Sequence, residues 1–206
     1  MTPGRPPGGR AGTAYRRLTD GPPFVQRRFG TARGLARLCL AQARQAMGGL
    51  RPFEQPDWAR VHRLVFVCAG NICRSPYAHH KARLLGHSAA SFALGGISGK
   101  PADPQACAAA LRRGVDLAAH RSCGIADFTV AEGDLLIAME PHQARTLARR
   151  FGAVPGVQVS LLGLWSRPSR PHLHDPYMLA PGYFDTCFAV IDSGLQAIGQ
   201  RLHQTP

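Results

Sequence analysis

The chain has 206 residues, of which 45% are hydrophobic and 18% charged, and its formal net charge is +13. This length and apolar content suit one folded domain with an appendage, and they exclude a chain that is disordered throughout. The apolar runs are far shorter than the roughly 20 residues of a membrane-spanning helix, and no secretory signal pattern opens the chain. The six cysteines are spaced irregularly, which predicts free thiols in a reducing compartment, the cytoplasm, and no disulfide scaffold.

The positive charge is concentrated in the first third of the chain. Residues 1–60 hold 11 arginines and 3 acids, a net charge of +8, whereas residues 61–206 hold 14 basic and 9 acidic residues, a net charge of +5. A basic surface can serve nucleic acid, anionic membranes or anionic substrates. Because no nucleic-acid-binding motif accompanies the charge, we expect no nucleic-acid partner.

The sequence pattern of residues 1–60 predicts a basic extension that is partly disordered. Residues 1–29 are rich in Pro, Gly and Arg without apolar periodicity, which indicates disorder. Apolar residues then recur at helical spacing near 34–50, which predicts a basic amphipathic helix. We expect this helix to pack on the domain behind it; reversible contact with an anionic membrane and a cleaved targeting segment are the alternatives. Residues 52–60 are predicted to form a linker.

Residues 61–206 predict a single α/β domain. Strands are expected at 64–67, 92–94, 134–138 and 157–162, and helices from Ser75 onward and at 104–113, 142–150 and 183–202. Strands that alternate with helices imply a doubly wound, four-stranded parallel sheet with helices on both faces. Ligands of such sheets bind beyond the carboxyl ends of the strands, so the loop after the first strand is the expected site.

That loop reads Cys68-Ala69-Gly70-Asn71-Ile72-Cys73-Arg74-Ser75-Pro76. A short turn between a strand and a helix N-terminus can direct backbone N–H groups at an anion, and Arg74 can add a bidentate contact to phosphate oxygens. The same N–H groups favour Cys68 as the nucleophilic thiolate, to which Ser75 can donate its hydroxyl. Cys107 and Arg113 share the Cys-to-Arg spacing but lack a preceding strand, so only the Cys68 loop has the expected context.

The loop resembles the phosphate-binding loop of the low-molecular-weight protein tyrosine phosphatases. Three further segments of the chain resemble this family in the same order: residues 99–121, 134–142 and 175–177. The resemblance covers about residues 61–203, and it is greatest to bacterial enzymes associated with exopolysaccharide production. It implies a cysteine-dependent phosphatase without metal or cofactor, acting on phosphotyrosine proteins such as a membrane-bound bacterial tyrosine kinase.

The resemblance implies a role for each matching residue. Cys68 would attack phosphorus and form a phosphocysteine, Arg74 would hold the phosphoryl oxygens, and Asp175 would serve as general acid and then base. Cys73 resembles a second loop cysteine that can form a reversible disulfide with the nucleophile, although a packed side chain is an equal alternative. The predicted substrate-binding residues are Ala69, Gly70, Asn71, Ile72, Cys73, Ser75 and Tyr177.

This chain departs from the family pattern at two places. His79 stands where the family usually has an acid, and residues 95–99 lack the aromatic side chain that borders the substrate slot in many members. The alternative functions are a thioredoxin-coupled arsenate reductase, for which Cys107 and Cys123 would have to act as resolving thiols, and a non-catalytic phosphate-binding adaptor. A phosphoarginine phosphatase is disfavoured because Ile72 replaces a Thr. A zinc site built from Cys68, Cys73, His79 and His80 matches no common pattern closely.

Overall fold

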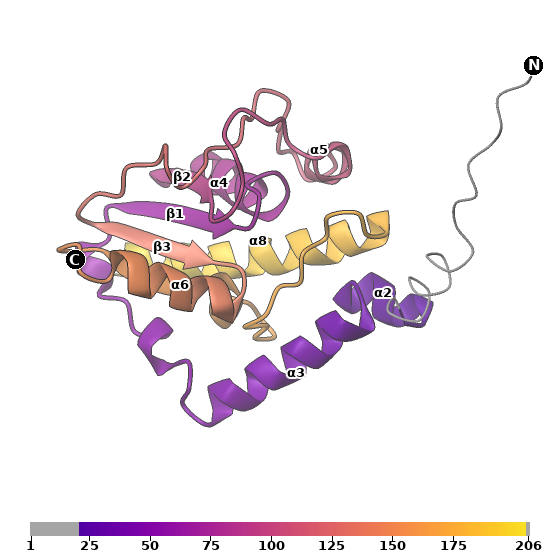
Figure 1. Ribbon diagram of the computed structural model, residues 1–206, viewed down its shortest axis with the longest axis horizontal. Helices are drawn as coiled ribbons and strands as arrows, with labels where there is room; N and C mark the ends of the chain where they lie inside the picture. The colour runs from indigo at the N-terminus through magenta and orange to yellow at the C-terminus, as the bar shows by residue number, and fades with distance from the viewer. Residues whose placement is uncertain (1–20, 205–206) are drawn as a thin grey trace, which may run out of the picture.

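The computed structural model describes residues 21–204 and confirms the expected α/β architecture (Figure 1). Four parallel strands pair in the order β2-β1-β3-β4. Their bounds are β1 Arg63–Cys68, β2 Ala89–Ala93, β3 Asp134–Ala138 and β4 Gln158–Leu161. Only β2 differs clearly from its prediction, because its first residues are small alanines and a serine that carry little strand signal.

Alternate side chains of β1 enter two different cores, because successive residues of a strand point to opposite faces of the sheet. Leu64 and Phe66 pack in one core, whereas Val65 and Val67 pack in the other. The central strands are buried on both faces, as a parallel sheet covered by helices requires. This burial fixes the register of β1 and therefore the position at which Cys68 leaves the sheet.

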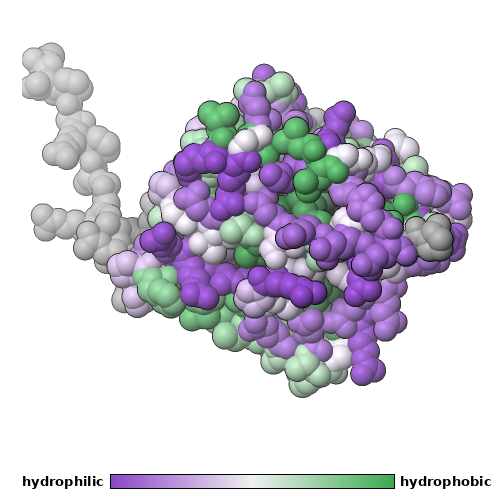
Figure 2. Space-filling view, turned by 180° about the vertical axis from the view of Figure 1, so that it is seen from behind, coloured by the Kyte–Doolittle hydropathy of each residue, from purple (hydrophilic) through white to green (hydrophobic). Residues whose placement is uncertain are grey.

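Helices cover both faces of the sheet (Figure 1). One core contains side chains of α4, α5 and α8, and the other contains side chains of α6. The bounds are α4 Arg74–Leu84, α5 Pro104–Leu111, α6 Pro141–Phe151, the short α7 Leu162–Trp165 and α8 Pro181–His203. The sequence did not predict α7. The face shown in Figure 2 is mostly hydrophilic, with apolar side chains gathered in small patches.

The prediction that residues 1–29 are disordered is wrong for Pro23–Phe29, which form helix α2; residues 1–20 lie outside the described part. Pro23 stands in the first turn, where its fixed φ suits a helix start. Contacts with the domain then hold the backbone of α2: Thr186 Oγ1 donates to Arg27 O at 2.8 Å, and Arg170 Nη1 donates to Arg28 O at 2.9 Å. A seven-residue helix needs such contacts, because it is too short to be stable alone.

The amphipathic helix expected near 34–50 is α3, Ala32–Ala46. Thr31 caps it by accepting a hydrogen bond from Gly34 N, and Leu38 and Ala41 are buried, so this helix packs on the domain. The expected linker is ordered, with 3-10 turns η1 at Arg51–Phe53 and η2 at Trp58–Arg60. Ser160 Oγ donates to Phe53 O at 2.7 Å, which ties this segment to β4.

None of the helices between residues 21 and 204 is both long and apolar enough to span a lipid bilayer.

Candidate active site

The loop between β1 and α4 turns sharply at Asn71. Cys68 is the last residue of β1, and α4 begins at Arg74. Asn71 adopts a positive φ of 52°, the left-handed conformation that Asn tolerates better than most residues. Gly96 approaches the loop so closely that a Cβ at this position would lie 3.0 Å from Gly70 O. The loop is therefore built from residues that its backbone path requires.

Asn71 fixes the loop through both ends of its side chain and through its carbonyl. Its Nδ2 donates to Ser75 Oγ at 2.8 Å and to Ser91 Oγ at 2.9 Å, while its Oδ1 accepts from Cys123 N at 2.9 Å. His120 Nε2 lies 2.9 Å from Asn71 O. These contacts make Asn71 the support of the loop. The sequence did not single out Ser91 or assign a role to His120, because a lone serine in a strand carries no recognisable signal.

Cys68 is buried, and its Sγ lies 3.0 Å from Ser75 Oγ. Because Ser75 Oγ accepts a hydrogen bond from Asn71 Nδ2, its own proton is free to point at the sulfur. A hydroxyl that donates to the thiolate stabilises the nucleophilic form over the thiol. These three side chains thus form one hydrogen-bonded chain that ends at the Cys68 sulfur.

Arg74 is fully buried between two carboxylates. Its Nη1 donates to Glu140 Oε1 and to Leu173 O, both at 2.7 Å, and its Nη2 lies 2.8 Å from Asp175 Oδ2. Burial alone would lower the pKa of Arg74, but the charges of Asp175 and Glu140 raise it, so the guanidinium stays charged. Its Nε has no hydrogen-bond partner among the described residues. A buried N–H without a partner is available to a phosphate oxygen.

Glu140 is another site residue that the sequence-based predictions missed. It follows β3, is buried, and pairs with Arg74. Burial would raise the pKa of Glu140, but the charge and hydrogen bond of Arg74 lower it below its ordinary value. Its place directly after a buried strand was the available signal, since ligands gather at the carboxyl ends of parallel strands.

We expect Glu140→Gln to destabilise the fold by about 1–3 kcal/mol at pH 7, because the amide keeps an acceptor but loses the charge facing Arg74. Since the pKa of Glu140 is lowered in the folded state, its contribution is present above its ordinary pKa of 4.5 and is lost as the pH falls through the folded value. The difference between wild type and variant should therefore shrink in acid. Urea unfolding at pH 7 and below pH 4 measures it.

Asp185→Asn is the matched control, since Asp185 pairs with Arg112 at the surface, where both side chains are about half exposed. Exposed ion pairs contribute at most about 1 kcal/mol, so this variant should change little. Equal effects of the two substitutions at pH 7 would contradict a structural role for the Glu140–Arg74 pair.

Asp175 reaches Arg74 from a loop 101 positions farther along the chain (175 − 74). Its side chain is 39% exposed and borders a pocket of about 330 Å³. The residues that line this pocket are Cys68, Ala69, Gly70, Ile72, Cys73, Gly95, Gly96, Lys100, Asp175 and Tyr177. The structure thus brings Cys68 and Asp175 to one pocket, with Arg74 between the loop and Asp175.

The predicted substrate-binding residues divide into two groups. Ala69, Gly70, Ile72, Cys73 and Tyr177 line the pocket, whereas Asn71 and Ser75 lie buried outside its lining and support the loop. Cys73 precedes α4 as its N-cap residue, and burial raises the pKa of its thiol. Cys73 is therefore held as a neutral thiol, unlike a nucleophile.

The two cysteines that an arsenate reductase would require lie on different elements. Cys107 belongs to α5, and Cys123 lies beyond it in a loop that hydrogen-bonds to Asn71. Both are free thiols, and burial raises the pKa of each. These two residues therefore do not form a pair of resolving thiols on one mobile segment.

Comparison with known proteins agrees with this geometry. The model of a family described as low molecular weight phosphotyrosine protein phosphatase matches residues 63–205. The probable low molecular weight protein-tyrosine-phosphatase EpsP of Ralstonia solanacearum is 33% identical over 144 residues, covering 69% of this chain and 97% of that protein. The low molecular weight protein-tyrosine-phosphatase Wzb of Salmonella typhimurium is 29% identical over 144 residues, covering 69% and 95%.

Solved structures show the same fold. The Erwinia amylovora tyrosine phosphatase AmsI superposes with a TM-score of 0.58 at 28% identity, covering 68% of this chain and 92% of that one. Vibrio vulnificus Wzb in complex with benzylphosphonate superposes with a TM-score of 0.59 at 26% identity, covering 68% and 99%. The first 62 residues of this chain lie outside the family match.

Proposed function

This chain belongs to the low molecular weight phosphotyrosine protein phosphatase family and is a protein-tyrosine phosphatase, and from this premise we propose that Cys68, Arg74 and Asp175 carry out its reaction. The observation that supports this assignment most strongly is the buried Arg74. It lies behind the thiol loop, pairs with Asp175 and keeps an unpartnered Nε. A charged guanidinium so placed suits the binding of a phosphoryl group.

In the proposed first step, the Cys68 thiolate attacks phosphorus and the bond from phosphorus to the phenolic oxygen breaks. Asp175, in its protonated form, gives its proton to the leaving oxygen, and the phosphoryl group remains on sulfur. In the second step Asp175 takes a proton from water, whose oxygen attacks phosphorus and releases Cys68 with inorganic phosphate. Arg74 and the loop N–H groups hold the other phosphoryl oxygens throughout.

The test is the hydrolysis of a phosphotyrosine peptide beside matched phosphoserine and phosphoarginine peptides, with a chelator present. We expect turnover of the phosphotyrosine peptide alone, because Tyr177 lines the same pocket as the thiol loop and can contact an aromatic ester. Preference for phosphoarginine would contradict the assigned substrate, and loss of activity with the chelator would contradict the metal-free mechanism.

The lining of the pocket includes one aromatic side chain and two consecutive glycines. The aromatic residue is Tyr177, which is half exposed, and the glycines are Gly95 and Gly96. A Cβ on Gly96 would meet Ala93 Cβ at 2.9 Å, but a Cβ on Gly95 would meet nothing within 4 Å. Gly95 is therefore the position that can accept a new side chain.

We expect Gly95→Phe to lower the KM for phosphotyrosine peptides by about 2- to 10-fold, since an added aromatic contact contributes about 0.5–1.5 kcal/mol. The kcat should change little, because the new ring contacts the substrate in the ground state and the transition state alike. Steady-state kinetics with aryl and alkyl phosphates measures the effect. An equal change in KM for both substrate classes would contradict a stacking role, and Gly96→Ala, which must displace the loop, should reduce activity.

We further propose that the protein substrate is the tyrosine-rich tail of a membrane-bound kinase that serves polysaccharide synthesis. The resemblance to bacterial exopolysaccharide-associated phosphatases supports this substrate. A cytoplasmic phosphatase that meets such a kinase would work close to the anionic inner face of the membrane. Its basic extension suits that position.

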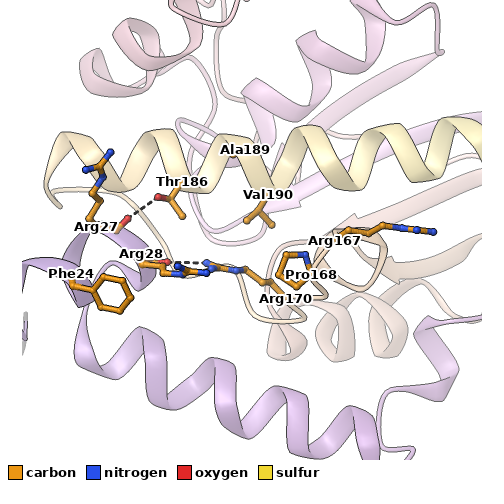
Figure 3. Close-up of a pocket in the computed structure, with 9 residues that line it drawn as sticks. All are labelled: Phe24, Arg27, Arg28, Arg167, Pro168, Arg170, Thr186, Ala189 and Val190. Carbon is orange, nitrogen blue, oxygen red and sulfur yellow. Dashed lines mark hydrogen bonds between the residues drawn. The ribbon is translucent and has the colours of Figure 1, made fainter.

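A pocket of about 480 Å³ between α2 and α8 supports contact with an anionic membrane (Figure 3). Four arginines line it, Arg27, Arg28, Arg167 and Arg170, and none of them pairs with a carboxylate within residues 21–204. Burial and the charge of Arg28 lower the pKa of Arg170. Phe24, 65% exposed, adds an apolar side chain beside the cations. We propose that this surface, with the basic helix near 34–50, contacts lipid headgroups.

Vesicle flotation tests this contact with the full chain. We expect binding to phosphatidylglycerol vesicles and none to phosphatidylcholine vesicles, and the double variant R27E/R28E should lose at least about 10-fold in binding, because each basic residue contributes about 1 kcal/mol. The double variant R149E/R150E makes the same charge change on the exposed end of α6. Equal losses in the two variants would indicate a nonspecific effect of net charge.

A further inference from the structure

Three histidines gather next to one another, and none of them lines the pocket of the thiol loop. His79 and His80 are adjacent on α4, and His120 reaches them from the loop that precedes Cys123. One ring nitrogen from each lies within 4.8 Å of the others. The rings of His79 and His80 have centroids 4.9 Å apart, and those of His80 and His120 are 5.6 Å apart. The proposed phosphatase reaction uses none of these rings as acid, base or nucleophile.

The hydrogen bonds of this cluster decide which ring nitrogens keep a free lone pair. His120 Nε2 faces Asn71 O, which can only accept, so Nε2 carries the proton and Nδ1 keeps its lone pair. His79 Nδ1 contacts Ser91 Oγ at 3.2 Å, while its Nε2 is buried and has no partner among the described residues. A buried ring nitrogen without a partner is costly unless something fills the space next to it.

We propose that His79, His80 and His120 bind one divalent transition-metal ion, with Zn²⁺ as the best fit. Neutral imidazole is a ligand that zinc, copper and nickel prefer, whereas magnesium and calcium need oxygen ligands, which this set lacks. Three nitrogen ligands from the protein leave one tetrahedral position for water. Zinc–nitrogen bonds are roughly 2.0–2.1 Å long, so the three nitrogens, which lie within 4.8 Å of one another, would have to move closer together around the ion.

The surroundings of the three rings disfavour their protonated forms. Burial and the mutual proximity of the rings lower the pKa of His79 to about 4, and burial also lowers the pKa of His80 and of His120, so the rings are neutral at pH 7. Asp116 adds a negative charge near His80, and Arg83 opposes it with a positive one. Neutral rings bind a metal without first releasing a proton.

The hydrogen bonds of the cluster connect this site to the catalytic loop. Metal-bound histidines usually donate their second nitrogen to a carbonyl or another acceptor, and His120 already does so toward Asn71. His79 contacts Ser91, which in turn accepts from Asn71 Nδ2. An ion on these rings would thus hold the residue that supports the loop. The set includes neither Cys68 nor Cys73, so it differs from a zinc site built on the thiols of the loop.

The experiment measures zinc binding to the full-length chain in a Cys68→Ser background, which keeps the metal off the catalytic thiol. Competition with a chromogenic zinc chelator gives the affinity, and visible absorption of the Co²⁺ form reports nitrogen ligands. His80→Gln removes the most accessible of the three rings. His203→Gln is the control, because His203 is exposed at the end of α8 and lies near a single other histidine, His87.

We expect one equivalent of zinc at micromolar concentration or below, and a rise in the unfolding temperature on adding zinc. His80→Gln should weaken binding by about 100-fold or more, since even the loss of an indirect supporting group costs 10–100-fold. His203→Gln should leave affinity and unfolding temperature unchanged. His79→Gln removes another proposed ligand in a separate variant. Circular dichroism without metal checks that each variant is folded.

Two results would overturn the metal site. The first is the absence of stoichiometric zinc binding to the Cys68→Ser chain. The second is a zinc affinity that stays unchanged in folded His80→Gln and His79→Gln chains. Such a result would place the ion elsewhere. Neither result bears on phosphotyrosine hydrolysis, so this proposal and the proposed function fail separately.

Discussion

Cys68→Ser is expected to abolish phosphotyrosine hydrolysis, with a fall in kcat of at least about 10³-fold, while the folded chain still binds phosphate. A serine hydroxyl of nearly the same size is intrinsically much less acidic and less nucleophilic than a thiol, so no competent nucleophile faces the phosphorus. The anion-binding parts of the loop do not depend on sulfur, because Asn71 supports the loop and Arg74 is held by Glu140. Steady-state kinetics measures the loss, and a thermal shift with inorganic phosphate measures the retained binding.

Cys39→Ser is the control for this experiment, because Cys39 is an exposed thiol of α3 and should be silent. Activity that survives Cys68→Ser but disappears with Cys73→Ser would make Cys73 the nucleophile. The structure argues against that outcome, since burial raises the pKa of Cys73, whereas the Ser75 hydroxyl lies 3.0 Å from the sulfur of Cys68.

The fold could be predicted because its signals are local. Runs of buried side chains such as Leu64–Val67 distinguish a covered parallel strand from a half-exposed one, and Pro76 and Pro104 indicate the first turns of α4 and α5. Helix α2 could not be predicted in this way. Its seven residues are stabilised by Thr186 and Arg170, more than 140 positions away, and no local pattern records such contacts.

The same distinction between local signals and distant contacts applies to the residues of the candidate site. Cys68 and Arg74 lie in one continuous segment whose spacing reads as a phosphate loop, and the sequence therefore indicated them together. Glu140, Ser91 and His120 converge on that loop from three other segments, through hydrogen bonds of 2.7–2.9 Å to Arg74 and Asn71. A single glutamate, serine or histidine occurs too often for its position to be informative before the sheet is assembled.

The proposed metal site differs from the zinc set that the sequence suggested but did not favour. Cys68, Cys73, His79 and His80 are close along the chain, which is why they were considered together. In the folded chain the two histidines of α4 lie beside His120, which comes from a distant loop, whereas both loop thiols line the pocket. Proximity in sequence was therefore a weaker guide than the contact between α4 and that loop.

Asp175→Asn is expected to lower kcat for phosphotyrosine peptides by about 10²- to 10³-fold, since an amide cannot donate the proton that the leaving phenolate needs. The loss should be smaller with an aryl ester whose phenol is strongly acidic, because that leaving group departs without full protonation. Binding of phosphate should not weaken. Asp175 Oδ2 lies 2.8 Å from Arg74 Nη2 in the ligand-free chain, so removing its charge frees Arg74 for the anion.

Asp185→Asn is again the matched control, because it makes the same chemical change at the surface and should leave kcat unaltered. The dependence on the leaving group separates acid catalysis from structural damage. A damaged pocket would slow all aryl esters equally and would weaken phosphate binding, whereas the loss of a proton donor slows the poor leaving groups most. Equal loss across leaving groups would mean that Asp175 positions Arg74 without donating the proton, and the acid would then have to come from another group at the mouth of the pocket.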